Sequence, residues 1–159
     1  MKGVDKGRCT AVLGWGLIEY NKGKIIPLKY GCIETDSGAV MPKRLAKIYH
    51  ELSDIIERDC PDEVAIEELF YFKNAKTVIT VAQARGAAII CAENMGLPVY
   101  EYTPLQVKQA ITGYGRADKN QMQEMVRITC NLDHCPKPDD AADALAVAIC
   151  HGQTNSQAN

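Results

Sequence analysis

The 159-residue sequence contains no long apolar run, no internal repeat and no low-complexity segment. None of its apolar stretches approaches the ~18 residues that span a membrane as a helix. Its first residues, MKGVDKGRC, lack the apolar core of a signal peptide. These absences argue against a membrane-spanning protein, a secreted protein and a repeat array. We therefore expect a single globular domain that is cytoplasmic.

The sequence also lacks a strong excess of one charge, because 18 Lys and Arg stand against 20 Asp and Glu. Many nucleic-acid-binding domains are basic, but acids clustered at a metal site can conceal a basic rim in such a total. The seven cysteines include no CxxC pair. A zinc site at Cys130, His134 and Cys135 is therefore a weaker interpretation than reduced, buried thiols.

The first half of the chain predicts an antiparallel hairpin. Residues 12–20 and 24–33 are typical of strands, and the segment 21–23, Asn-Lys-Gly, is typical of the turn between them. Pro27 predicts an irregularity in the second strand. Residues 1–5 are expected to form a short strand ahead of the hairpin, which makes three strands with antiparallel character.

The rest of the chain alternates helical and strand patterns, so the whole sequence predicts a mixed α/β fold. We expect one domain over residues 1–151, followed by a polar tail over 152–159 that is disordered. The predicted helices cover 42–58, 74–95, 104–113, 118–132 and 138–150, and the predicted strands cover 63–70 and 97–103.

Residues 138–150, PDDAADALAVAIC, predict an apolar helix whose beginning carries three aspartates. Helix N-termini favour Asp because their N–H groups are unpaired, so Asp139 or Asp140 can act as a cap. Asp140 and Asp143 share a helix face, where two like charges repel unless a cation lies between them. Capping and metal binding are therefore both open interpretations of this helix.

Other carboxylates can reach the same place, because functional sites of α/β sheets lie at the carboxyl ends of strands. Asp5 and either Glu67 or Glu68 fall at such ends, and adjacent strand residues point to opposite faces, so only one glutamate can join. Oxygen donors suit Mg²⁺ or Mn²⁺, and two such ions ~4 Å apart promote phosphodiester cleavage. Each acid also has a structural interpretation: a turn residue at Asp5, a surface charge at Glu67 and a cap at Asp140.

Three long motifs occur in an order and at a spacing that resemble those of the RuvC family, the bacterial Holliday-junction resolvases. Outside its first residues, the resemblance covers nearly the whole chain. The motifs are AIEELFYFKNAKTVITVAQARGAAI at 65–89, VYEYTPLQVKQAITGYGRADKNQMQEMV at 99–126 and DDAADALAVAICH at 139–151.

The resemblance implies a ribonuclease H-like fold, with a five-stranded mixed sheet flanked by helices, and a homodimer. The implied activity is the resolution of four-way DNA junctions by symmetric paired nicks, in recombination and repair. It depends on Mg²⁺, with two ions at each site and with Mn²⁺ able to substitute. The implied partners are junction DNA, a junction-binding tetramer and a branch-migration helicase.

The resemblance also implies roles for individual residues. Glu67, Asp140 and Asp143 match the catalytic, metal-binding carboxylates, and Asp5 is the candidate for the fourth. Lys108 and Lys119 match basic residues near the scissile strand, although solvated surface lysines are the alternative on sequence grounds alone. The remaining candidates for contact with DNA are Phe70, which matches an aromatic beside the site, and the phosphate-binding candidates Lys73 and Arg85.

The helix predicted at 74–95 is unusually rich in small residues, which permit a close approach between helices. Tight packing on the chain's own sheet is one interpretation, and contact between the two copies of a dimer is the interpretation that the resemblance favours. The small residues are Ala82, Ala84, Gly86, Ala87 and Ala88.

The N-terminus departs from the family pattern. Lys6 stands where the family has proline, and two residues too many separate Asp5 from Gly14. With a two-residue insertion Asp5 takes the position of the first catalytic aspartate, and without it that position falls on Gly7. The alternative to an active nuclease is therefore a junction-binding protein whose site is weakened or inactive.

Overall fold

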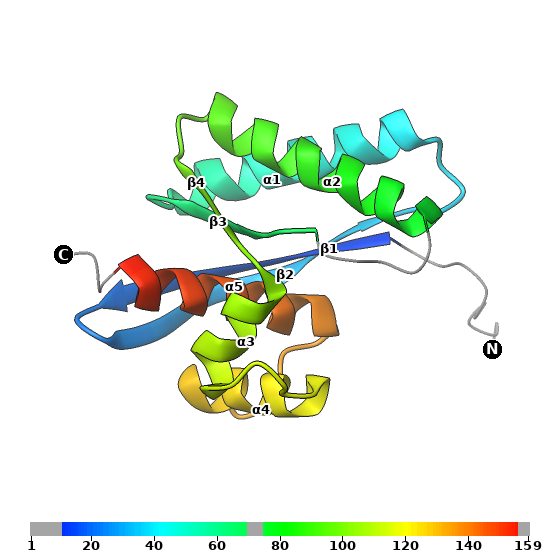
Figure 1. Cartoon of the computed structure of the whole chain (residues 1–159). Helices are drawn as coiled ribbons and strands as arrows, with labels where there is room; N and C mark the ends of the chain where they lie inside the picture. The colour runs from blue at the N-terminus through cyan, green and yellow to red at the C-terminus, as the bar shows by residue number, and fades with distance from the viewer. Residues whose placement is uncertain (1–10, 70–74, 156–159) are drawn as a thin grey trace, which may run out of the picture.

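The computed structural model describes residues 11–69 and 75–155 (Figure 1). The predicted site residues Asp5, Phe70 and Lys73 lie outside these ranges. The elements are β1 (Ala11–Asn21), β2 (Lys24–Thr35), α1 (Met41–Asp59), β3 (Val64–Glu67), α2 (Ala75–Asn94), β4 (Val99–Tyr102), α3 (Pro104–Thr112), α4 (Lys119–Thr129) and α5 (Asp139–Asn155). This order confirms the mixed α/β class.

Strands β1 and β2 form the predicted antiparallel hairpin. Lys22 and Gly23 both have positive φ, 48° and 86°, which suits the tight two-residue turn of a right-twisted hairpin. The register shifts where Leu17 pairs with Lys29 and the next residue, Ile18, pairs with Pro27. The irregularity predicted from Pro27 is therefore confirmed, since proline has no N–H for the ladder.

Strands β3 and β4 form a separate parallel pair of four residues each. The strand predicted at 63–70 is therefore too long, since β3 ends at Glu67. Among the described residues the strands make two two-stranded sheets rather than one sheet of five strands. A groove of about 1330 Å³ is lined by β1, β3 and the apolar face of α1.

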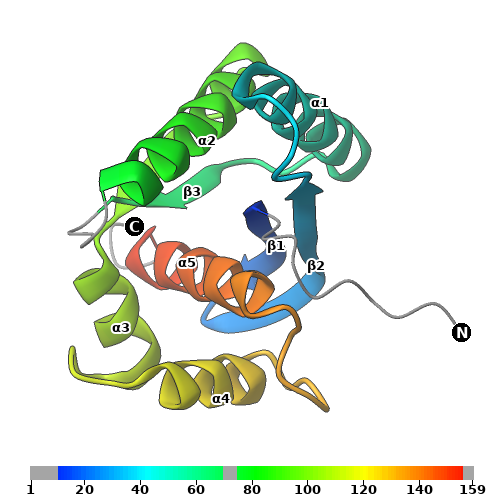
Figure 2. The same ribbon diagram turned by 90° about the vertical axis from the view of Figure 1, so that its right-hand side faces the viewer.

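The helices lie on both sides of the strands (Figures 1 and 2). Helices α1 and α2 pack on each other on one side, while α5 packs against β1 and, together with α3 and α4, covers the other. Within residues 11–69 and 75–155, no helix is both long and apolar enough to span a bilayer.

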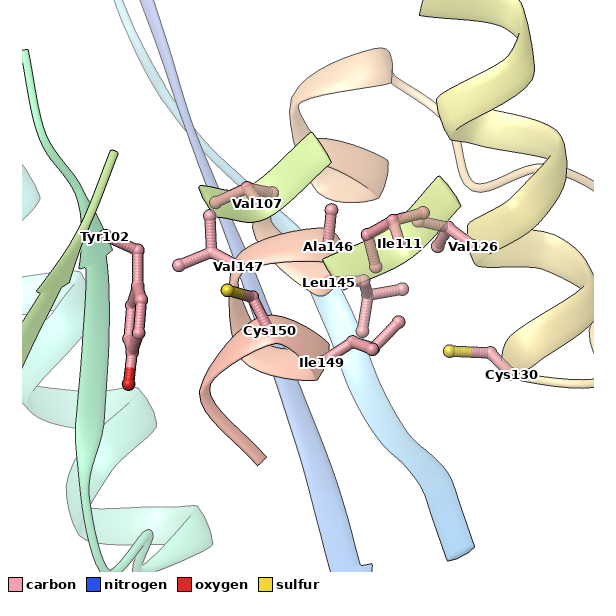
Figure 3. Packing of buried hydrophobic residues seen from close by; sticks show 10 residues of the cluster. All are labelled: Tyr102, Val107, Ile111, Val126, Cys130, Leu145, Ala146, Val147, Ile149 and Cys150. Carbon is pink, nitrogen blue, oxygen red and sulfur yellow. The ribbon is translucent and has the colours of Figure 1, made fainter. Parts of the chain in front are cut away.

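Helix α5 is the centre of the main core (Figure 3). Leu145 and Ile149 are fully buried there, packed with Val107 of α3 and Val126 of α4. Cys150 is also buried, with a free thiol, as expected for an interior cysteine. The remaining buried members of the cluster are Tyr102, Ile111, Cys130, Ala146 and Val147.

The C-terminal boundary differs from the sequence prediction. Helix α5 continues to Asn155, so the disordered tail expected from residue 152 is wrong for its first four residues. Two polar contacts hold this last turn: the Thr154 hydroxyl donates to the Cys150 carbonyl, and the Asn155 amide donates to the Glu63 carboxylate at 3.1 Å. The polar composition that suggested disorder instead supplies these hydrogen bonds.

Candidate active site

Two glycines of β1 bring the start of α5 onto the sheet. A Cβ atom at Gly14 would lie 1.9 Å from the carbonyl oxygen of Asp140, and one at Gly16 would lie 2.9 Å from Leu145 Cδ2. Because residues two apart on a strand share a face, the segment Gly14-Trp15-Gly16 presents a bare backbone to the helix. Glycine inside a strand is a known sequence signal of close backbone approach, and it could have identified this contact.

This contact places the first turns of α5 beside the end of β3. A pocket of about 220 Å³ lies there, and it gathers four of the predicted site residues from four different elements. They are Glu67, Lys108, Lys119 and Asp143, and the rest of the lining is Pro104, Val107, Met122 and Ala146.

Burial disfavours the charged form of both carboxylates of this pocket. Burial raises the pKa of Glu67, the nearby Asp143 raises it further, and Lys108 opposes the shift. Burial also raises the pKa of Asp143; Lys119 opposes this shift, and Asp140 and Asp139 add to it. The charged forms of both groups are therefore disfavoured, mainly by burial, and a bound cation would relieve this cost.

Lys119 enters the pocket from the first position of α4. Asp118 caps this helix: its carboxylate accepts from the Gln121 N–H at 2.9 Å, and the Gln121 side chain accepts from the Asp118 N–H at 3.0 Å. The Lys119 ammonium lies 3.1 Å from a carboxylate oxygen of Asp139, which raises the pKa of Lys119.

Asp139 differs from the other two aspartates of α5, because two lysines neutralise it. Its carboxylate lies 2.9 Å from Lys137 Nζ and 3.1 Å from Lys119 Nζ, and these contacts lower its pKa to about 2. Asp140 instead lines the large groove together with Glu67 and Asp143. The three acidic residues that open the helix are thus divided between a surface ion pair and the candidate site.

Arg85 of α2 lies at the same end of β3 but contacts protein groups. Its Nε donates to the main-chain carbonyl of Glu67 at 3.1 Å, and its Nη2 pairs with the Glu101 carboxylate of β4. Arg85 was predicted to bind DNA phosphates; in the structure these two protein acceptors occupy two of its donors.

The donor set suits a hard divalent cation, because carboxylate oxygens are the ligands that Mg²⁺ and Mn²⁺ prefer. Asp143 lies close enough to Glu67 for its charge to raise the pKa of Glu67. Among residues 11–69 and 75–155, however, no three acidic, His or Cys side chains come close enough to ligate one ion. Asp5, the candidate for the fourth carboxylate, is outside these ranges.

A mixed α/β fold that gathers carboxylates and lysines at the end of a strand is typical of ribonuclease H-like phosphodiester hydrolases. The family model "Crossover junction endodeoxyribonuclease RuvC" matches residues 1–151 of the chain. The chain belongs to the RuvC family.

Relatives of this family cover nearly the whole chain. RuvC from Caldanaerobacter subterraneus subsp. tengcongensis is 56% identical over 154 residues, which are 97% of this chain and 92% of the relative. RuvC from Desulfitobacterium hafniense is 53% identical over 152 residues, 96% of this chain and 91% of the relative. Both are described as crossover junction endodeoxyribonucleases.

Solved structures agree with this assignment. Thermus thermophilus RuvC has a TM-score of 0.85 and 33% identity, with 92% of this chain and 90% of the other covered. T. thermophilus RuvC in complex with a Holliday junction substrate has a TM-score of 0.83 and 30% identity, with 92% and 89% covered. The fold of the chain is therefore ribonuclease H-like, as the resemblance implied.

Proposed function

We propose that this chain is a crossover junction endodeoxyribonuclease, which resolves four-way DNA junctions by paired symmetric nicks in recombination and repair. The observation that carries the proposal is the pocket where Glu67 and Asp143 meet Lys108 and Lys119, in a chain that the RuvC family model matches over residues 1–151. A close structural relative is a complex with a Holliday junction substrate, which supports the same class of ligand.

Nucleases of this family depend on a metal. We propose that Glu67, Asp140 and Asp143, with Asp5 as the fourth carboxylate, hold two Mg²⁺ ions and that Mn²⁺ can replace them. Bound metal supplies an activated water and neutralises charge on the leaving 3′ oxygen. The electrostatic support is the raised pKa of Glu67 and Asp143, since a bound cation stabilises carboxylates whose charge is disfavoured by burial.

The protein's own contribution to the reaction is to hold the scissile phosphate. The ammonium groups of Lys108 and Lys119 flank the carboxylates, so they can bind the non-bridging phosphate oxygens and stabilise the charge that develops on them. Phe70 and Lys73, which lie outside the described residues, remain proposed DNA contacts on the resemblance alone.

A fifth strand belongs to this proposal. The groove between β1 and β3 is lined by strand residues on two sides and by the apolar face of α1, including Ile48 and Ile56. We propose that residues from the N-terminal segment complete a five-stranded mixed sheet there, within one domain that spans residues 1–151. Asp5 would then enter the site from the strand next to Glu67.

We further propose that the chain acts as a homodimer through α2. Ile79 and Ile90 of this helix are 59% and 55% exposed, and a Cβ at Gly86, which lies between them, would meet no atom of another described element within 4 Å. Exposed apolar side chains around a bare glycine fit a second copy of the helix, and two-fold symmetry supplies two matched cuts.

The remaining partners and the location follow from the proposed substrate. A chain that cuts four-way junctions acts with the junction-binding tetramer and the branch-migration helicase that the resemblance implies. Because its substrate is chromosomal DNA, we place the chain in the cytoplasm.

The proposal is tested with a labelled four-way junction and a Mg²⁺ titration. We expect paired nicks from the natural chain, and a loss of at least about 100-fold in nicking rate for Glu67→Gln and Asp143→Asn, because each removes charge stabilisation at the reacting phosphate. Junction affinity should stay the same or increase, since a negative charge near phosphate is removed.

Glu68→Gln is the matched control. It makes the same chemical change one residue further along, where the main-chain N–H still pairs with the Tyr102 carbonyl of β4. It should nick at close to the natural rate. A natural chain that forms a stable but uncut complex at every Mg²⁺ concentration would favour the junction-binding alternative, and undiminished nicking by Glu67→Gln would refute the site.

A further inference from the structure

Arg85 connects three elements at the point where the carboxylate-bearing strand ends. It projects from α2, donates from Nε to the Glu67 carbonyl of β3 at 3.1 Å, and pairs through Nη2 with Glu101 of β4. Its side chain is only 20% exposed. An arginine that is mostly buried, with two protein acceptors already bound, is poorly placed to bind a DNA phosphate.

The strand geometry explains why the Glu67 carbonyl needs this donor. The N–H groups of Val64 and Glu68 donate to carbonyls of the β4 segment, at 3.0 and 2.8 Å. Main-chain groups of successive strand residues point to opposite sides, so the Glu67 carbonyl points away from β4. Among residues 11–69 and 75–155, Arg85 donates to it there, so the end of β3 is hydrogen-bonded to β4 on one side and to α2 on the other.

The hydrogen bond from Arg85 to the Glu67 carbonyl also affects the carboxylate of Glu67. Glu67 is the last residue of β3, and its side chain faces the like charge of Asp143, which favours its displacement. Strand ends are among the first places where a fold opens locally. The hydrogen bond from Arg85 fixes the main chain of Glu67, from which the carboxylate projects into the pocket that also holds Lys108 and Asp143.

We propose that Arg85 is a positioning residue for the Glu67 carboxylate and does not anchor DNA. The inference rests on the proposed nuclease function for its kinetic consequences, while its structural part concerns the metal-free chain. The charge of Arg85 is not what matters here; the planar guanidinium is, because it binds a carbonyl and a carboxylate at the same time, which an ammonium on a flexible stem does not reproduce.

The decisive variant is Arg85→Lys, which keeps the positive charge. We expect nicking at saturating junction to fall by about 10–100-fold, as is typical when a group that orients a metal ligand is removed, while the junction Kd measured without metal changes by less than about twofold. If Arg85 instead anchors a DNA phosphate, Arg85→Ala should weaken junction binding and raise the Kd. Arg85→Lys should then bind the junction as tightly as the natural chain. Either that pattern or full activity of Arg85→Lys would overturn the proposal.

A readout independent of catalysis is amide hydrogen exchange in the metal-free chain. In Arg85→Lys the Glu68 amide, which bonds the Tyr102 carbonyl next to the clamp, should lose protection, with the thermal midpoint almost unchanged. Undiminished protection of this amide would also overturn the proposal, and it does so even if the chain proves not to be a nuclease.

Arg127→Lys is the matched control. Arg127 also joins a carboxylate to a carbonyl, because its Nη2 pairs with Glu124 at 2.7 Å and its Nη1 donates to the Leu132 carbonyl at 3.0 Å. This second clamp holds the end of α4 and does not line the candidate pocket. Its loss should leave nicking and Glu68 exchange as they are in the natural chain, whereas an equal effect would mean that any arginine clamp matters only for stability.

Discussion

The first turns of α5 show how neighbours of the same chemical type acquire different roles from their surroundings. Asp139 lies between two lysines and its pKa falls to about 2, so it remains charged under all ordinary conditions. Asp143 lies one turn further, where burial and other acids raise its pKa. Asp139 therefore belongs to a surface ion pair that contributes little to stability. Asp143 is a carboxylate whose charged form the fold disfavours, and it lies at the candidate metal site.

The raised pKa values of Glu67 and Asp143 predict how stability depends on pH in the metal-free chain. The folded state binds more protons than the unfolded state once the pH passes about 4, the ordinary value for these groups. Stability should therefore fall as pH rises from about 4 through the raised values. Asp139 has the opposite effect, because its folded pKa is lowered to about 2: it adds stability that is lost as the pH falls below about 4.

Urea unfolding at several pH values between about 4 and 7 measures this effect. Glu67→Gln and Asp143→Asn should each make the metal-free chain more stable at neutral pH and flatten the slope, because each removes a charge that the fold disfavours. If stability instead rises over this range, with the same slope in both variants, Glu67 and Asp143 are not the carboxylates whose charge the fold disfavours.

At the scale of the elements, the site depends on the direct contact between β1 and α5. Side chains of ordinary size would hold the helix away from the strand, and the carboxylates of α5 would then not reach the end of β3. Gly14 and Gly16 remove that obstacle, and the apolar face of α5, with Leu145 and Ile149, holds the helix in place.

Gly14→Ala tests this arrangement. The added methyl group would lie 1.9 Å from the Asp140 carbonyl, and two backbones must separate to admit it. We expect a loss of about 1–3 kcal/mol or more in the free energy of unfolding, with nicking reduced because Asp140 and Asp143 move. Gly38→Ala, whose Cβ would meet only the side chain of Asp36, with the nearest atom at 3.4 Å, should change stability by less than about 0.5 kcal/mol. Equal stability of the two variants would show that α5 adapts easily.

For the whole molecule, the relevant feature is the exposed face of α2. Helix α2 lies on the side of the strands opposite α4 (Figure 2), and its Ile79 and Ile90 are exposed. The pocket that contains Glu67 lies among β3, α3, α4 and α5, so an interface through α2 would leave both active sites open to DNA.

Gly86→Arg should convert a dimer into monomers, because a large charged side chain replaces a bare surface that fits a second helix. Sedimentation of the natural chain should show a dimer, and the variant should replace paired nicks with single, uncoupled nicks. Ile128→Arg, at a residue of α4 that is 53% exposed, is the matched control and should remain dimeric. A dimer that persists in Gly86→Arg would exclude this face of α2 as the interface.

Much of the fold was predictable because its causes are local. The turn Asn21-Lys22-Gly23, the proline at 27 and the helical spacing of 42–58 act over a few residues, and the structure has a hairpin, an irregularity and a helix there. The errors lie at the ends of elements. The tail from residue 152 was predicted to be disordered because it is polar, but α5 continues to Asn155. The Asn155 amide there donates a hydrogen bond to Glu63, which is distant in sequence.

The sequence by itself determined the order of elements, the family and the residue types available for catalysis, because long motifs and hydrophobic periods are properties of contiguous chain. Only the tertiary structure decided which aspartate is neutralised by lysines, that Gly14 touches the backbone of Asp140, and that Arg85 holds Glu67. These facts depend on how closely segments remote in sequence approach each other, and that distance is set by the packing of the whole core rather than by any local pattern.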